Sequence, residues 1–166
     1  MEMKLDSLEA LYVDQLKDLY NAEKQLIDAL PKMARTAHSG DLKRGFEEHL
    51  DQTRQQAKRL EKIFSDRGEK PDGVKCLGME GLIKEAEKYV NSKNADPLVR
   101  DAALIAAAQR VEHYEISGYG TARAYAITLE FMEDARLLKQ SLDEESRTDE
   151  KLTTMAESHI NEQAIA

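Results

Sequence analysis

The chain has 166 residues, a length that suits one domain with its own core. Its formal net charge of −8 argues against nucleic acid as a partner, because phosphate binding needs a basic face. The longest strongly apolar run, residues 102–108, is too short to span a bilayer. Cys76 is the single cysteine, so no internal disulfide forms, and residues 1–5 lack the apolar stretch of a signal peptide. We therefore expect a cytoplasmic protein that binds neither nucleic acid nor a membrane.

The first two helical patterns predict an antiparallel hairpin. Apolar residues recur every three or four positions over residues 6–36, which is typical of a long amphipathic helix. Residues 39–40 end this helix, and Asp41 is the expected N-cap of a second helix over residues 42–65. The connection is so short that the two helices must pack antiparallel.

A long crossover follows, and then a second pair of helices. Residues 67–73 are rich in glycine, proline and charge, which indicates a loop, and residues 79–89 form a short amphipathic pattern. Asp96 is the expected N-cap of a helix over residues 97–128, with proline at its first position. The last helix is expected over residues 129–160, and no strong helix breaker marks where it begins.

These patterns predict an all-α chain in which two antiparallel hairpins are joined by a long crossover that carries one short helix. A long connection between two hairpins is typical of ferritin-like four-helix bundles, whereas simple up-and-down bundles lack it. No strand pattern competes with the helices. We expect one ferritin-like domain that occupies residues 1–166.

Acidic side chains interrupt the apolar stripes near the middle of the expected helices. Glu23, for example, lies between Leu19 and Leu26 on the first stripe. A carboxylate in a bundle core is costly unless it is paired, and a bound cation is a natural partner for several of them. The alternative is that the stripes are rotated and the acids face solvent. The candidate metal ligands are Glu23, Glu112, Glu115, Glu145 and Asp149, together with His49 on the second stripe.

The histidines depart from the usual pattern of a di-iron bundle. Such bundles draw a Glu-x-x-His pair from two helices, and no such pair occurs in this chain. His49 is therefore either a metal ligand or a core histidine bonded to a neighbouring carboxylate. Gln52 and Gln56 occupy stripe positions, where they either donate hydrogen bonds to the acids or offer a weak carbonyl ligand. A ligand set rich in oxygen suits iron or manganese at a two-metal site.

Several motifs resemble those of the YciF-like stress-response proteins, a ferritin-like family long known only as a domain of unknown function. The motifs are Asn21-Ala22-Glu23-Lys24-Gln25-Leu26, His49-Leu50 followed by Thr53, Lys75-Cys76 with Met79-Glu80-Gly81-Leu82-Ile83, and Ala106-Ala107-Ala108-Gln109 with Val111-Glu112-His113-Tyr114-Glu115-Ile116. The resemblance implies a ferritin-like dimer, a two-metal carboxylate centre and production under bacterial stress, without an assigned reaction. It places the five candidate acids where the family keeps its acids, and Gln52 where a glutamate is expected.

Two functions are weighed. The first is a di-iron or di-manganese protein that oxidises Fe(II) or scavenges peroxide, with dioxygen or peroxide as its substrate. Glu23 and Glu145 would each bind one ion, Glu112 or Glu115 would bridge, and Asp149 or His49 would complete the set. The second is a non-enzymatic helical homodimer that binds a protein partner and has an empty or degenerate metal site. The missing Glu-x-x-His pair and Gln52 favour the second.

Overall fold

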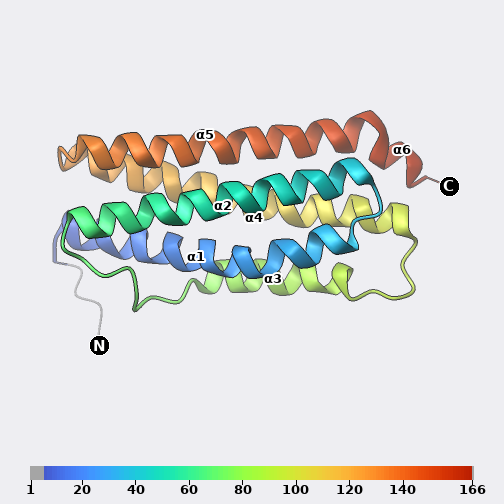
Figure 1. Cartoon of the computed structure of the whole chain (residues 1–166), viewed down its shortest axis with the longest axis horizontal. Helices are drawn as coiled ribbons and strands as arrows, with labels where there is room; N and C mark the ends of the chain where they lie inside the picture. Colours follow the sequence, from blue (N-terminus) through green and yellow to red (C-terminus); the bar gives the residue numbers. More distant parts are fainter. Residues whose placement is uncertain (1–5, 166) are drawn as a thin grey trace.

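Four long helices lie side by side and form a bundle (Figure 1). The structure, a computed structural model, describes residues 6–165, so the expected absence of a signal peptide at residues 1–5 lies outside the described residues. The helices of the bundle are α1 (Leu8–Thr36), α2 (Gly40–Asp66), α4 (Pro97–Thr128) and α5 (Met132–Met155). The first two form one antiparallel hairpin and the last two form the other.

The connections follow the expected ferritin-like order. The crossover between the hairpins carries α3 (Leu77–Val90), which packs along α1 and α4 on the outside of the bundle (Figure 1). Besides its hairpin partner, α1 contacts α4, and α5 contacts α2, so the four long helices enclose a common interior. Within residues 6–165 all regular elements are helical. The predicted all-α four-helix bundle with one crossover helix is confirmed.

The turn between α1 and α2 differs from the expected one. Ser39, not Asp41, is the N-cap of α2, and its hydroxyl accepts a hydrogen bond from the Leu42 amide. The buried carboxylate of Asp101 on α4 accepts hydrogen bonds from the backbone amides of His38 at 2.8 Å and Ser39 at 2.6 Å. The prediction of Asp41 was wrong because this contact from α4 fixes the backbone before position 41. The predicted cap at the start of α4, Asp96, is confirmed.

The second hairpin turns at residues 129–131, where the sequence shows no breaker. Glu130 adopts the left-handed conformation with φ of 61°, and α5 begins only at Met132 instead of at residue 129. The guanidinium of Arg67 lies 3.5 Å from the centroid of the Phe131 ring and 3.2 Å from a carboxylate oxygen of Asp134. Contacts from the end of α2 therefore hold this turn in place.

The C-terminal helix continues almost to the end of the chain. After α5 the backbone widens into a single π-helical turn, Ala156–Ile160, and ends in α6 (Asn161–Gln163). The expected end of the last helix near residue 160 therefore falls in this π-turn. None of the helices in the described part of the chain is long and apolar enough to cross a membrane.

The apolar interior is divided into two clusters, one at each end of the bundle. The cluster near the α1–α2 turn includes Leu26, Leu42, Leu104 and Leu152, and the cluster near the α4–α5 turn includes Leu16, Leu60, Ala126 and Leu138. Each long helix has at least one buried polar residue near the level where the two clusters meet. This gap in the apolar core is where the candidate ligands lie.

Candidate metal centre

A layer of buried polar side chains separates the two apolar clusters. It consists of Glu23 from α1, His49, Thr53 and Gln56 from α2, Glu112 and Glu115 from α4, and Glu145 from α5. None of these residues is more than 2% exposed. The alternative in which the acids face solvent is therefore wrong for these four glutamates. We call this set the polar layer.

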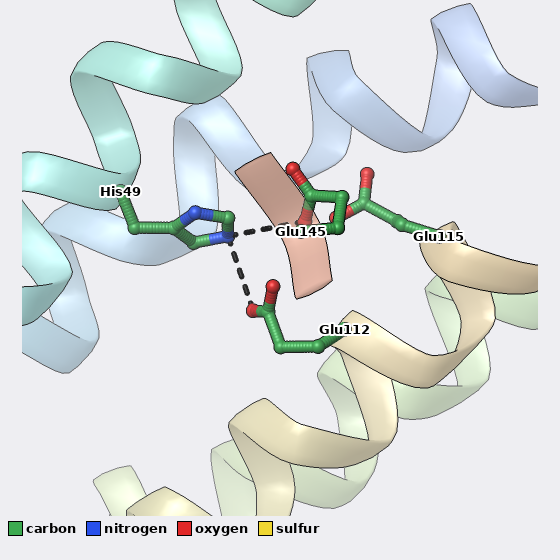
Figure 2. Close-up of side chains that lie close together, drawn as sticks. All are labelled: His49, Glu112, Glu115 and Glu145. Carbon is green, nitrogen blue, oxygen red and sulfur yellow. Dashed lines mark ion pairs between the residues drawn. The ribbon is translucent and has the colours of Figure 1, made fainter. Parts of the chain in front are cut away.

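Four members of the polar layer converge on one point. His49, Glu112, Glu115 and Glu145 each offer a ligand atom, and these four atoms all lie within 4.8 Å of one another. Figure 2 shows the four side chains reaching from three different helices toward a common centre. Because each helix holds its side chain at a fixed level of the bundle, packing of the helices brings the four together before any ion is bound.

His49 faces two of the carboxylates without forming a hydrogen bond to either. Its Nε2 atom lies 3.1 Å from Oε1 of Glu112 and 4.0 Å from Oε2 of Glu145. Both ring nitrogens are buried and lack a hydrogen-bond partner. An unpaired buried imidazole costs free energy in the metal-free protein, and a cation bound by one of its nitrogens would remove that cost.

Several carboxylate oxygens of the layer also lack hydrogen-bond partners. Both oxygens of Glu115 and the Oε2 atoms of Glu112 and Glu145 are buried without a hydrogen-bond partner. Within residues 6–165 the ion pairs of lysine and arginine go to other acids, so no basic side chain neutralises these three. Most buried polar atoms in proteins are satisfied, and each exception needs an explanation. Oxygen and imidazole atoms left open around one point could hold a metal ion.

The electrostatics of the layer favour the protonated forms of its acids. Burial raises the pKa of Glu112 to about 8, and burial together with the charge of Glu112 raises that of Glu145 to about 8. The pKa values of Glu23 and Glu115 lie well above the usual value, first because of burial and then because of neighbouring carboxylates. A bound cation would reverse this preference and hold the carboxylates ionised.

These shifts predict how the stability of the metal-free protein depends on pH. Glu112 and Glu145 have an ordinary pKa of 4.5 when exposed and about 8 in the fold, so the native state binds more protons between these values. The free energy of unfolding should therefore fall as the pH rises from about 4.5 to about 8. Thermal melts in EDTA across this range test the prediction, and a melting temperature that rises over the same range would contradict it.

Glu23 lies beside the group of four. Its Oε1 atom accepts a short hydrogen bond from the hydroxyl of Tyr119, and its Oε2 atom is buried without a partner. The charge of Glu145 contributes to the raised pKa of Glu23, and the charge of Glu23 contributes to that of Glu115, so the three lie close together. Tyr119 also packs in the apolar cluster near the α4–α5 turn, so this side chain both fills the core and donates a hydrogen bond to the layer.

Gln56 belongs to the same layer, as its stripe position suggested. Its amide nitrogen donates a short hydrogen bond to Oε1 of Glu145 and a second one, of 3.1 Å, to Glu144. Arg59 then pairs with Glu144 at 2.6 Å and so fixes the outer side of this contact. Sequence reasoning missed Arg59, and the available signal was its position three residues after Gln56 on the same helix face.

Asp149 lies apart from the four converging side chains. One of its oxygens accepts a hydrogen bond from Gln109 at 3.2 Å, and the other lies 3.2 Å from Nε2 of His113. His113 itself is mostly exposed. Gln52 is also outside the group, and its side-chain oxygen accepts a hydrogen bond from the Thr148 hydroxyl at 3.2 Å.

The chain matches known proteins along nearly its whole length. The sequence model of the family described as "Domain of unknown function (DUF892)" matches residues 7–165. Protein YciF of Escherichia coli (strain K12) is 44% identical over 163 residues, which cover 98% of each chain. This chain belongs to the YciF-like DUF892 family. The resemblance inferred from the sequence motifs is confirmed.

Solved structures of this family have the same fold. The crystal structure of the E. coli stress protein YciF superimposes with a TM-score of 0.90 at 43% identity and covers 95% of this chain and 99% of that one. YcfI from Rhodopseudomonas palustris gives a TM-score of 0.88 at 42% identity and covers 93% and 98%. A more distant protein from Xanthomonas campestris, at 21% identity, shares the fold with a TM-score of 0.73 over 92% of each chain.

Proposed function

We propose that this YciF-like chain is a stress-response metalloprotein. It holds two iron or manganese ions in the polar layer and uses them to oxidise Fe(II) or to remove peroxide. The observation that carries the proposal is the convergence of His49, Glu112, Glu115 and Glu145 around one buried point, with unpaired ligand atoms on all four. The stress role is supported by the description of the E. coli relative as a stress protein.

The charge of the layer supports two ions. Glu23, Glu112, Glu115 and Glu145 carry four negative charges when ionised, and His49 is neutral when it binds a metal. Two divalent cations balance four ionised carboxylates, whereas with a single cation two of the buried glutamates would have to stay protonated to avoid the cost of an uncompensated charge. This charge balance does not need an acid at position 52, because the four buried glutamates already supply four negative charges.

The positions of the side chains suggest how the ligands divide. Nε2 of His49 lies 3.1 Å from Glu112 and 4.0 Å from Glu145, and among the neighbouring carboxylates Glu145 raises the pKa of Glu23 most. Glu23 and Glu145 would then bind one ion each, and Glu112 or Glu115 would bridge. Of the two candidates to complete the set, the structure favours His49, because both oxygens of Asp149 already face partners on α4.

The redox step takes its electrons from the metal. Two ferrous ions held by these residues would supply the two electrons that, with two protons, reduce hydrogen peroxide to two water molecules. The chain would provide buried ligands for these ions. Gln56 and Tyr119 hold Glu145 and Glu23 in place by hydrogen bonds.

Metal uptake tests the proposal directly. We expect the purified protein, stripped with EDTA, to bind up to two equivalents of Fe(II) or Mn(II) in an anaerobic titration followed by elemental analysis. Glu145→Gln removes a charge from the centre of the group and should lose at least one of these equivalents. Glu150→Gln makes the same change at an exposed position on the same helix and should leave the stoichiometry unchanged.

The contrary outcome is equally clear. Binding no higher than that of a protein without such a site, or equal binding by wild type and Glu145→Gln, would remove the polar layer as the metal centre. The proposal for iron or manganese chemistry would then fall.

Two features of the ligand set favour a second function. Gln52 and the missing Glu-x-x-His pair reduce the usual ligand set, which suits a homodimer that binds a protein partner and has a degenerate site. Such a protein would show the same melting temperature with and without metal, since a ligand raises stability only if it binds the native state. Its mass in solution, measured by light scattering, tests the homodimer separately.

A further inference from the structure

A pocket enters the bundle between α2 and α5 and leads to the polar layer. Its volume is about 70 Å³. The outer lining comprises the exposed residues Glu48, Arg147 and Lys151, and the inner lining includes His49 and Glu112. Since both inner residues belong to the group of four converging side chains, the pocket connects the surface with the centre. The other members, Glu115 and Glu145, are not part of its wall.

The size and lining of the pocket limit what it can admit. One water molecule needs about 10–15 Å³ of such space, so the pocket has room for a few water molecules or for another molecule of a few heavy atoms. Gln52 and Thr148 line it on opposite helices and bond to each other across it. Together with His49, they offer hydrogen-bonding groups to a small polar molecule, while Leu152 and Met155 make the remaining wall apolar.

The outer lining also selects by charge. Lys151 of α5 forms a short ion pair with Glu48 of α2, and this pair spans the two helices at the mouth. Arg147 adds a second positive charge. Two cations and one acid leave one net positive charge at the mouth, which disfavours the approach of a metal cation and permits a neutral molecule.

We propose that this α2–α5 pocket is the route by which hydrogen peroxide reaches the centre. The inference rests on the proposed function and assigns it a substrate: a small, neutral molecule that both donates and accepts hydrogen bonds. Gln52 and Thr148 are then positioning residues of the route, and the ion pair between Lys151 and Glu48 restricts its mouth. Gln52 places an uncharged amide in the wall of this passage.

Two substitutions change the route in opposite directions. Thr148→Met fills the pocket from α5 with an apolar side chain, and Lys151→Ala removes the ion pair that spans its mouth. Thr154→Met places the same methionine at an exposed position of α5, where the native hydroxyl bonds only to its own helix backbone, and serves as the control.

The experiment uses the full chain and has two readouts, one on protein loaded with Mn(II) and one on protein loaded with Fe(II). The first is the relaxation of water protons by the bound Mn(II), which reports how easily water reaches the ion without any turnover. The second is the rate at which Fe(II)-loaded protein is oxidised by hydrogen peroxide under anaerobic conditions. Thr148→Met should lose most of the relaxation enhancement and react severalfold more slowly, Lys151→Ala should exceed wild type in both, and Thr154→Met should match wild type.

Metal stoichiometry separates the two proposals. If wild type and Thr148→Met bind equal amounts of Mn(II) yet show equal relaxation and equal peroxide rates, this route is overturned and the metal centre stands. If Thr148→Met does not fold, unchanged readouts in Lys151→Ala overturn the route by themselves. If wild type binds neither Mn(II) nor Fe(II), both proposals fall together.

Discussion

Saturating Mn(II) should raise the melting temperature of the stripped protein by about 5–10 °C at neutral pH. A ligand that binds only the native state at a hundredfold excess over its Kd adds about 2.7 kcal/mol, and each kcal/mol shifts the melting temperature of a chain of this size by roughly 2–4 °C. The effect is expected to be large because the metal-free layer contains four buried glutamates and an unpaired imidazole. Differential scanning calorimetry with and without EDTA measures it.

The shift should also follow the residues of the layer. Glu145→Gln is expected to lose most of the shift, since it removes a charge that faces Glu23, Glu112 and His49. Glu150→Gln, at an exposed position on the same helix, should retain the full shift. A shift of equal size in both variants would mean that Mn(II) acts elsewhere on this acidic chain. No shift in wild type would favour the partner-binding homodimer.

Glu115→Leu should stabilise the metal-free protein and abolish its response to metal. Glu115 is fully buried, neither of its oxygens has a hydrogen-bond partner, and its pKa is raised well above the usual value by burial and by neighbouring carboxylates. A buried polar group without a hydrogen-bond partner costs about 1–3 kcal/mol, and an apolar residue of similar size removes that cost. In EDTA the variant should therefore melt several degrees above wild type, and the order should reverse when Mn(II) is added.

Glu115→Gln separates charge from packing in this comparison. It keeps the shape of the side chain and removes the ionisable group, so it should also lose the response to metal but gain less stability than the leucine variant. Chemical denaturation in EDTA gives the free energies. A leucine variant less stable than wild type in EDTA would show that Glu115 contributes to the metal-free fold and would contradict a layer built for a cation.

The sequence predicts the level of the polar layer well, because helical periodicity is a local property. The interruption of the first stripe by Glu23, between Leu19 and Leu26, is enough to place it inside the bundle. The same reasoning finds Glu112 and Glu115 on α4. Four helices of similar length, paired through short turns, then bring these positions to one level.

Asp149 shows where periodicity stops being informative. It follows Glu145 by four residues, which on an ideal helix is one turn further along and rotated by about 40°. That rotation and rise bring it opposite Gln109 and His113 of α4, instead of opposite Glu112. Whether a position one turn from a layer belongs to it depends on which side chains the neighbouring helix offers there, and a single helical pattern carries no information on this.

The turns were harder to predict because distant residues determine them. Ser39 and Asp41 are both good capping residues, and the choice between them is made by Asp101, which lies on another helix. The second turn has no glycine at the position with positive φ, and it is held by Arg67 against Phe131. Neither contact leaves a local signature in the chain.

The division of the apolar interior into two clusters affects how the bundle opens. Because the polar layer separates the two clusters, we expect that in the metal-free protein each cluster can lose its packing while the other remains intact. Ions bound at mid-length by side chains of all four long helices would join the two halves into one cooperative unit. Amide hydrogens on both sides of the layer would then exchange with solvent at a common rate, and loss of metal would let the two ends fluctuate independently.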